Sequence, residues 1–441
     1  MKDSSPARPS FKEALAFWFK LGWISFGGTA GHIAIMHDFL VGEKKWISNS
    51  RFFHALSFCM LLPGPEAQQL AIYIGWKLHG KKGGLAAGIL FVFPSMIILL
   101  ALSILYVLYG DLPWMRAIFT GLKPAVIAII LIALFKIGKK ALHGLLHLAV
   151  AILAFGCIFF YNISLILILV GAILLALVIH RLRPSLLRVA TKEKGQEDAD
   201  EREYFLNKYS PLPPGGNPIK RLPVQLAVFA GCWLVPLLVF YFFSAEFGFW
   251  KTLILFFTQT AVFTIGGSYT VLPYVAQFAV GKLGWLSRLQ MVDGFALAET
   301  TPGPLIIVVG FVGFMAGYHH SHGSIWVGSM ALIATVYYTF LPCFLYIFAG
   351  GPIIERTHGN AVIEGVLGLV IAAVVGVILN LVLFLGRDVI FPGGVSMLHP
   401  DWLALGWVVV SLFLLVKGKM NVVYLILLSL AVGLIRYFVM G

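Results

Sequence analysis

Long apolar stretches, separated by short polar loops, make up most of the chain. They lie near residues 84–109, 115–137, 142–160 and 162–180, and again near 324–349, 361–385, 401–416 and 420–440. A further one, Leu222–Phe243, stands alone between the two groups. Each is at or near the length of a helix that crosses the hydrocarbon core of a bilayer. The pattern predicts an all-α polytopic membrane protein, with the lipid bilayer as its surroundings.

Two apolar segments in each group are interrupted by helix-breaking residues. The first segment of each pair breaks at Gly-Gly (Phe11–Leu40 and Trp250–Ala279), and the second breaks at Pro-Gly-Pro (Phe52–Trp76 and Met291–Gly317). A break inside a bilayer leaves backbone N–H and C=O groups that lipid cannot satisfy, so it must be enclosed by protein or line a cavity. Paired broken helices are a pointer to the binding site of a transporter.

The chain repeats itself at a shift of 239 positions. In that frame Phe26-Gly27-Gly28-Thr29 falls on Ile265-Gly266-Gly267-Ser268, Trp46 on Trp285, and Pro63-Gly64-Pro65 on Pro302-Gly303-Pro304. Apolar segments resemble one another by chance, but Gly-Gly, Trp and Pro-Gly-Pro in one frame do not. The chain therefore divides into a first half, 1–180, a polar linker, 181–221, a connecting helix, 222–244, and a second half, 245–441.

The unpaired segment predicts that the two halves are inverted. If the broken segments are re-entrant hairpins, each half has an even number of full spans, and one extra span turns the second half over. Basic residues mark cytoplasmic loops, and they favour the hairpin ends of the first half: Lys44, Lys45, Arg51, Lys77, Lys81 and Lys82, against Lys282 and Arg288 in the second half. We expect a cytoplasmic N-terminus and an external C-terminus. If some hairpins span as broken helices instead, the span count changes.

Composition narrows the class of protein further. Of 441 residues, 60% are hydrophobic and 12% charged, which no soluble globular protein matches. The net charge of +13 follows from basic loop ends, so we expect no nucleic-acid partner. The four cysteines are scattered, and His319, His320 and His322 lack local acidic or thiol partners, so we expect no metal site. No nucleotide, flavin or haem motif stands out, so we expect no cofactor and no enzyme.

The broken helices predict an anion site. A helix that starts at mid-membrane points free N–H groups and its positive dipole end into the cavity. Side chains near the breaks would add donors, and Lys123, inside a span, would add positive charge. The candidate substrate-binding residues are Gly27, Gly28, Thr29, Pro63, Gly64, Pro65, Gln68, Lys123, Gly266, Gly267, Ser268, Thr300, Thr301, Pro302, Gly303 and Pro304. The alternative is that the breaks only shape helix packing.

Two carboxylates are candidates for proton coupling. Glu66 directly follows the first Pro-Gly-Pro break and Glu299 comes shortly before the second. Ionisable residues inside spans are costly and are functional hypotheses by default. The alternative is that each carboxylate is satisfied by backbone N–H groups or by a basic partner. Asp38 and Asp293 lie closer to the hairpin ends, where we expect them to be solvated.

The duplicated order of Phe26-Gly27-Gly28, Trp46 and Leu62-Pro63-Gly64-Pro65 resembles the chromate ion transporter family in its long form with two homologous halves. The resemblance covers about residues 11–440. It implies efflux of chromate, with sulfate as a competitor, across the bacterial inner (cytoplasmic) membrane, giving chromate resistance. Ile265 replaces the phenylalanine of the motif in the second half, and Leu305 stands where Glu66 does, which places symmetric roles in doubt.

Three readings of function follow. The first is a secondary active exporter of a divalent oxyanion, driven by membrane potential and optionally by protons. The second is a sulfate or other oxyanion channel or importer of the same architecture; a channel would never move substrate against its electrochemical gradient. The third is a membrane-embedded chromate reductase, which no redox motif supports. A homodimer is compatible with the sequence.

Overall fold

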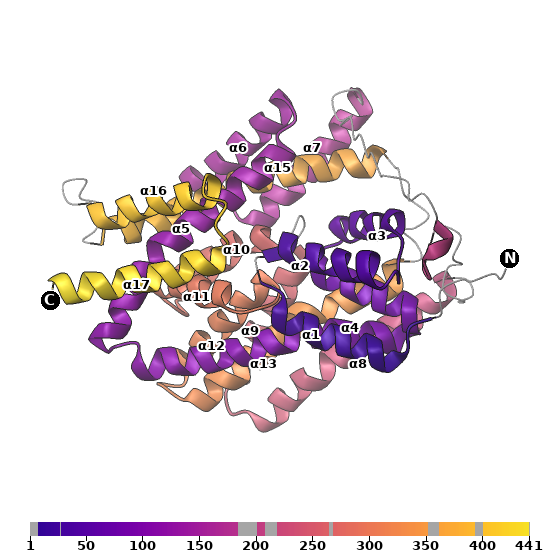
Figure 1. Cartoon of the computed structure of the whole chain (residues 1–441), viewed down its shortest axis with the longest axis horizontal. Coiled ribbons are helices and arrows are strands. Elements are labelled where there is room, and N and C mark those ends of the chain that lie inside the picture. Colours follow the sequence, from indigo (N-terminus) through magenta and orange to yellow (C-terminus); the bar gives the residue numbers. More distant parts are fainter. Residues whose placement is uncertain are drawn as a thin grey trace.

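The computed structural model describes residues 8–26, 28–183, 201–207, 218–263, 268–351, 361–392 and 400–440. Within those ranges the chain is helical throughout, and its β-structure is limited to one isolated bridge between Ile47 and Leu206. The all-α fold predicted from the apolar pattern is therefore confirmed. Figure 1 shows the helices packed along one long axis, with α1 toward the end marked N and α17 toward the end marked C.

The first half begins with two pairs of short helices and continues with longer ones. The helices are α1 (Phe11–Ile24), α2 (Gly28–His37) with a π-helical extension η1 (Asp38–Glu43), α3 (Asn49–Leu61), α4 (Glu66–Tyr109), α5 (Pro113–Ala141), α6 (Leu145–Tyr161) and α7 (Leu165–Leu182). Within α4, His79 and Gly80 leave helical geometry. It is therefore a short helix up to Leu78 followed by a long one from Lys81.

The second half has the same order of elements after the connecting helix α8 (Pro218–Phe243). The helices are α9 (Phe247–Phe263), α10 (Ser268–Ala276) with its π-helical extension η4 (Gln277–Lys282), α11 (Arg288–Thr300), the 3-10 turn η5 (Leu305–Ile307), α12 (Val308–His320), α13 (Ile325–Leu345) with η6 (Tyr346–Gly350), α15 (Ala361–Ile390), α16 (Trp402–Val416) and α17 (Val422–Met440).

Local structure is duplicated at the same 239-residue shift that relates the sequences. The π-helical extensions η1 and η4 end with matching hydrogen bonds, Lys44 N–H to Phe39 O (2.9 Å) and Leu283 N–H to Phe278 O (2.8 Å). Ser48 caps α3 and Ser287 caps α11, each by accepting a backbone N–H three residues on. Side-chain caps of this kind fix where a helix begins. The small polar residues thus set equivalent boundaries in the two halves.

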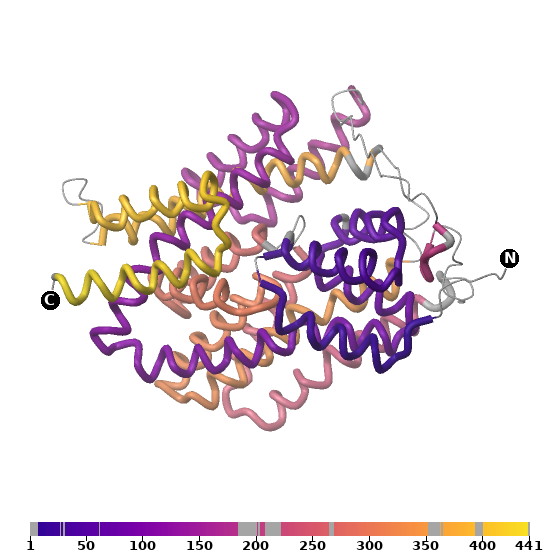
Figure 2. The backbone as a smooth tube through the Cα atoms, in the orientation of Figure 1, coloured from indigo at the N-terminus to yellow at the C-terminus, as the bar shows by residue number. Residues whose placement is uncertain are grey.

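The broken segments of the first half turn back on themselves. The Glu13 carboxylate near the start of α1 lies 2.9 Å from the Lys44 ammonium just after η1. The Arg8 guanidinium donates to Leu78 O at 2.8 Å, which brings the end of the short part of α4 to the same place. Figure 2 shows these indigo segments gathered at one end of the molecule, with the yellow α16 and α17 at the opposite end. The chain therefore enters and leaves each pair on one side.

The second half closes in the same way. The His319 imidazole near the end of α12 lies 2.7 Å from Trp285 O, which precedes α11. The ring of His320 stacks on Phe249 near the start of α9, and its Nε2 pairs with Glu246. The ends of α9, η4, α11 and α12 thus meet, and their breaks lie away from that end.

The helix lengths suit a membrane. Seven helices among the described residues are long and apolar enough to cross one, while α6 and α16 are shorter apolar helices of 17 and 15 residues. Large apolar side chains face outward on the peripheral helices, as with Phe243, which is 86% exposed on α8. An apolar exterior of this extent would be a liability in water and is required by lipid.

Part of the polar linker is docked on the first half. Leu206 N–H donates to Trp46 O at 2.9 Å, and Ser48 N–H donates to Leu206 O at 2.8 Å. The Ser50 hydroxyl donates to the Glu201 carboxylate at 2.6 Å, and Lys45 pairs with Glu203. We call residues 201–207 the linker strap. The sequence identifies 181–221 only as a polar linker and gives no sign of this contact, because its partners are about 155 residues away in the chain.

Candidate functional site

Each Pro-Gly-Pro break ends one helix and starts another. The glycines Gly64 and Gly303 have φ values of +117° and +97°, a region that residues with a Cβ rarely adopt. A Cβ on Gly303 would lie 1.9 Å from the Ser95 hydroxyl oxygen, and one on Gly64 would lie 2.9 Å from the Cys343 sulfur. Two properties of each break therefore require glycine: the positive φ of the backbone and the lack of room for a Cβ.

Each break packs against a long helix of the opposite half. Gly303 N–H donates to Ser25 O at 2.6 Å, and the Ser95 hydroxyl of α4 donates to Pro302 O at 2.5 Å. The break at Gly64 lies against Cys343 of α13. These contacts give the freed backbone groups protein partners, as burial in a membrane demands. The two halves are thus held together at their broken helices.

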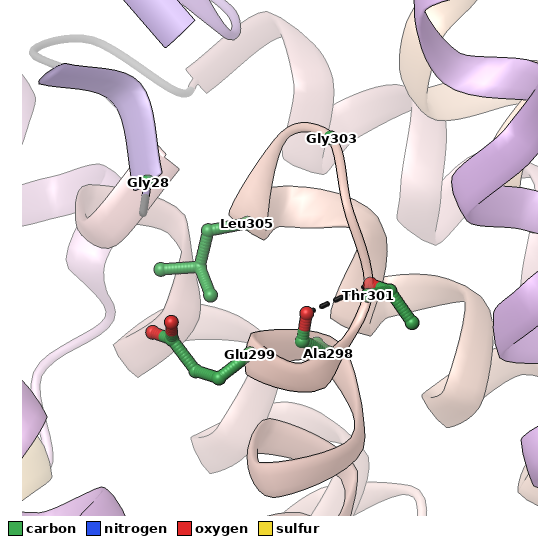
Figure 3. Close-up of a pocket in the computed structure, with 6 residues that line it drawn as sticks. All are labelled: Gly28, Ala298, Glu299, Thr301, Gly303 and Leu305. Atoms are coloured by element: carbon green, nitrogen blue, oxygen red, sulfur yellow. Dashed lines mark hydrogen bonds between the residues drawn. The ribbon is translucent and has the colours of Figure 1, made fainter. Parts of the chain in front are cut away.

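A small cavity opens where the Gly-Gly break of the first half meets the Pro-Gly-Pro break of the second. Figure 3 shows its lining: Gly28, Ala298, Glu299, Thr301, Gly303 and Leu305. The space for water-sized molecules is about 10 Å³, close to the minimum for a single water molecule. A tetrahedral oxyanion does not fit without movement of the walls. This conformation is therefore closed.

The threonines of the second break use their hydroxyl hydrogens locally. The Thr300 hydroxyl donates to Leu297 O at 2.6 Å, and the Thr301 hydroxyl donates to Ala298 O at 2.7 Å, as the dashed line in Figure 3 marks for Thr301. Either hydroxyl would have to rotate before it could donate to an anion. In the closed conformation these groups offer lone pairs, and the N–H groups of Thr301 and Gly303 are already bonded to Ala298 O and Ser25 O.

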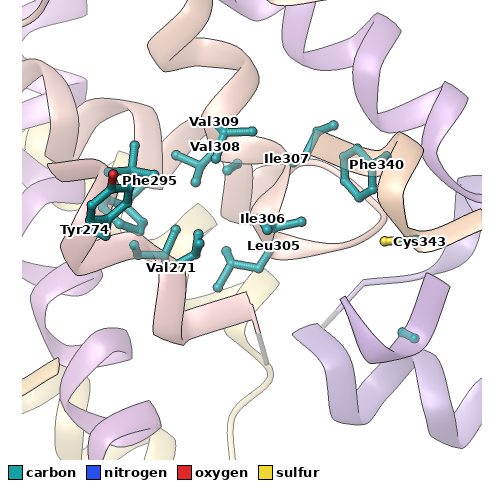
Figure 4. Packing of buried hydrophobic residues seen from close by; sticks show 14 of the residues in the cluster. Val271, Tyr274, Phe295, Leu305, Ile306, Ile307, Val308, Val309, Phe340 and Cys343 are labelled. Carbon is teal, nitrogen blue, oxygen red and sulfur yellow. The ribbon is translucent and has the colours of Figure 1, made fainter. Parts of the chain in front are cut away.

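The helix that follows the second break lies in the protein core. The side chains from Leu305 to Ala316 are buried, and Figure 4 shows Ile306, Val308 and Val309 among them. A helix that is apolar all round is an interior helix. Its first turn, η5, starts at Leu305, so no carboxylate occupies that end. The start of this buried helix is free of negative charge at its first position.

The two candidate coupling carboxylates lie at different breaks. Glu299 lines the cavity and accepts a long hydrogen bond of 3.4 Å from the Tyr269 hydroxyl. Glu66 is the first residue of α4, is 7% exposed, and does not line this cavity. A carboxylate at the first position of a helix interacts with the same N–H groups that an anion would use. Glu66 therefore occupies the anion position of the first break.

The side chains beside Glu66 are buried. Gln68 and Gln69 are at most 1% exposed, and the side-chain oxygen of each lacks a hydrogen-bond partner among the described residues. The Gln69 amide donates to Pro63 O, which braces the break, and the Gln68 amide donates to Gly88 O at 3.3 Å. Gln68 thus lies on the helix that leaves the first break.

Lys123 is engaged by a residue whose position sequence reasoning misjudged. The Lys123 ammonium lies 3.3 Å from Asp293 Oδ1, and the Tyr106 hydroxyl donates to Asp293 Oδ2 at 3.0 Å. Asp293 is only 4% exposed, so the expectation that it is solvated is wrong. A buried charge needs a partner, and the packing of α11 against α5 and α4 supplies one. A carboxylate seven residues before Thr300 gave no sequence signal of that pairing.

Some candidate residues lie outside the described part of the chain. Gly27, Gly266 and Gly267 are not among the described residues, and the side chain of Ser268 is also outside them. Thr29 is half-buried on α2, one residue beyond the cavity-lining Gly28. Pro63, Pro65 and Pro304 delimit their breaks without lining the cavity. The cavity therefore combines Gly28 with Thr301, Gly303 and Glu299, and leaves the first Pro-Gly-Pro break apart.

No group of three or more His, Cys, Asp or Glu side chains in the described part of the chain is placed to hold a metal ion. His319 and His320 make the loop contacts given above, and the four cysteines are free.

Comparison with known proteins gives one family. A profile described as "Chromate transporter" matches residues 12–177 and 251–434. A "Probable chromate transport protein" of Synechococcus elongatus is 31% identical over 88% of this chain and 89% of its own length. A "Chromate transport protein" of Cupriavidus metallidurans is 28% identical over 84% and 82%. The "Uncharacterized transporter YwrA" of Bacillus subtilis aligns over 29% of this chain but 72% of itself. No solved structure matches.

Proposed function

Because the chain belongs to the chromate transporter family, we propose that it exports chromate across the bacterial cytoplasmic membrane and so confers chromate resistance, with sulfate as a competitor. Chromate transport is what the homologues support. Direction, energy coupling and the sulfate competition are our own inferences.

The cavity between Gly28 and Gly303 is the observation that carries this proposal. It joins a Gly-Gly break of one half to a Pro-Gly-Pro break of the other, next to the start of the buried helix that begins at Leu305. Helix starts supply N–H donors and a positive dipole end, which suit an oxyanion. Both breaks come from one copy of the chain, so the account needs no second subunit.

An inverted repeat of two halves accounts for the arrangement. The duplicated caps and π-helical extensions, the single connecting helix α8 and the matching profile hits on both halves support it. The start of α1 and the end of α17 lie toward opposite ends of the long axis (Figure 1), as an odd number of crossings requires. We place the N-terminus in the cytoplasm, because the basic hairpin ends belong to the first half.

Membrane potential suffices to drive export. A negative-inside potential favours expulsion of a dianion by about 4–5 kcal/mol per 100 mV, from about 2.3 kcal/mol per charge. The closed cavity favours a carrier that alternates between two sides over an open channel. Each access state would require the walls around Gly28 and Gly303 to separate.

Proton coupling follows from the position of Glu299. A dianion about 4 Å from an ionised carboxylate is repelled by about 8 kcal/mol at an effective dielectric constant of about 20. Chromate and ionised Glu299 therefore exclude each other from one cavity. We infer that Glu299 is protonated when the anion is bound. Glu66 at the other break would couple in the same way only if an anion visits that break.

Everted membrane vesicles test the proposal. Export becomes uptake in such vesicles, so labelled chromate should accumulate above its external concentration under an inside-positive potential, and excess sulfate should suppress the uptake. Replacing Pro302-Gly303-Pro304 by alanines should abolish it. Uptake that only equilibrates, at rates far above carrier turnover, would establish a channel. Absence of protein-dependent uptake would remove chromate as the substrate.

A further inference from the structure

His32 is a buried histidine that the account so far does not use. It lies on α2, has no exposed surface, and neither ring nitrogen makes a hydrogen bond to any described residue. Buried polar groups are almost always paired, so each exception calls for an explanation. A neutral imidazole always carries one N–H donor. This donor is buried and has no partner of standard hydrogen-bond geometry among the described residues.

The surroundings of His32 adjoin the second break, although His32 itself does not line the cavity. His32 follows Gly28 by one helical turn, which places both on one face of α2. Its ring packs edge-on against Phe91 at 5.5 Å between centroids, and the backbone of Ser25 lies beside it, outside hydrogen-bonding geometry. Ser25 O accepts the Gly303 N–H, and Phe91 O lies next to Gly303. Both neighbours of the ring therefore touch the residue that closes the second break.

We propose that His32 is an oxyanion-binding residue of this cavity, donating its ring N–H to a tetrahedral dianion held between Gly28 and Gly303. The proposal rests on the proposed function and names a donor for it. A donor usually has to shed water before it binds a ligand, which cancels much of the gain. His32 is buried and forms no hydrogen bond of standard geometry to a described residue, so a bond to an anion would displace little beyond its contact with the Ser25 backbone.

This role makes the two halves unequal. The position equivalent to His32 at the 239-residue shift is Val271, a buried apolar residue. The position equivalent to Glu299 is Met60. The imidazole of the first half and the carboxylate of the second therefore belong to the same break region, and neither is duplicated at the other. Among the described residues, this role places the oxyanion site at one break region.

Three variants and one titration test the proposal. His32→Phe keeps an aromatic ring beside Phe91 but removes the N–H, whereas His32→Gln keeps a donor. His147→Leu is the matched control, since His147 is 5% exposed on α6 and its Nε2 also lacks a partner. Chromate binding to purified protein is measured by calorimetry. We expect His32→Phe to weaken binding by about tenfold or more, as loss of one charge-assisted hydrogen bond does, and the other two variants to bind nearly as the natural chain does.

A second readout needs no variant to fold perfectly. With ¹⁵N-labelled histidine, chromate should shift one imidazole resonance of the natural chain, and that resonance should be missing in His32→Gln. Folded His32→Phe that binds chromate normally, or the absence of any shifted resonance on binding, would overturn the assignment. If the natural chain binds neither chromate nor sulfate, the proposed function itself fails, which is a different result.

Discussion

The buried ion pair between Lys123 and Asp293 gives a sharp test of what Lys123 does. The two charged groups are 3.3 Å apart, and their side chains are 18% and 6% exposed. The pair joins α5 of the first half to α11, the helix that ends at the second break. Three variants separate its roles: Lys123→Met, Asp293→Asn, and the double variant Lys123→Met with Asp293→Leu.

The magnitude follows from the geometry. At 3.3 Å the attraction is about 5 kcal/mol for an effective dielectric constant of about 20. Removing one partner of a buried pair costs about 3–5 kcal/mol because the other charge is left unpaired, whereas replacing both by apolar residues is often neutral. An unfolding entropy of about 2.1 cal/mol/K per residue over 441 residues converts that cost to a fall in Tm of about 3–5 °C.

The assay pairs thermal unfolding in detergent with chromate uptake in everted vesicles. We expect both single variants to lose stability and transport, and the double variant to regain both. Arg116→Met is the control, because Arg116 and Asp111 form an exposed pair whose side chains are 67% and 97% exposed and such pairs contribute little. A double variant as stable as the natural chain that still fails to transport would refute the reasoning and return Lys123 to the anion pathway.

Three further predictions concern the breaks and the linker strap. Gly303→Ala should lower transport by about tenfold or more in the vesicle assay, because a left-handed backbone costs a residue with a Cβ about 1–2 kcal/mol and that Cβ would meet Ser95. The control is Gly281→Ala, where a Cβ meets nothing within 4 Å, and this variant should transport normally. Equal losses of transport in the two variants would contradict the geometry. Glu299→Gln should leave chromate uptake active but independent of pH, because the amide cannot ionise. The control is Asp38→Asn at an exposed position, which should keep the pH profile of the natural chain. An unchanged pH profile in Glu299→Gln would refute the proposed role of Glu299 in proton coupling. Deleting residues 201–207 should speed trypsin cleavage after Lys45 by about fivefold or more, as loss of even one net hydrogen bond of about 1 kcal/mol predicts. Cleavage after Lys282 is the internal reference, and unchanged cleavage after Lys45 would show that the strap does not protect the loop.

The sequence predicted the elements that depend on local punctuation. Apolar length located the long helices, and Gly-Gly and Pro-Gly-Pro located the breaks, because a glycine with positive φ and a proline without N–H act on their own segment. The turn at His79 and Gly80 lies in the polar stretch 77–84, between two apolar segments that the sequence predicts as separate, and the structure has two helical parts there.

Contacts between distant segments were beyond the sequence. The bond from Gly303 to Ser25, the pair of Lys123 with Asp293, and the docking of Leu206 beside Trp46 join residues far apart in the chain. Periodicity says which face of a helix is apolar but not which helix covers it. His32 went unnoticed because a lone histidine on an apolar helix has no pattern, and its significance comes only from the absence of a partner among the described residues.

The location of bound chromium tests the central claim most directly. Crystals of the protein soaked in chromate, measured at the chromium absorption edge, give an anomalous difference peak that marks the metal atom of the anion. We predict a peak between Gly28 and Gly303, within hydrogen-bonding reach of His32 through an anion oxygen, with the walls of the cavity moved apart. A strong peak elsewhere, with the cavity still closed, would contradict the site proposed for this transporter.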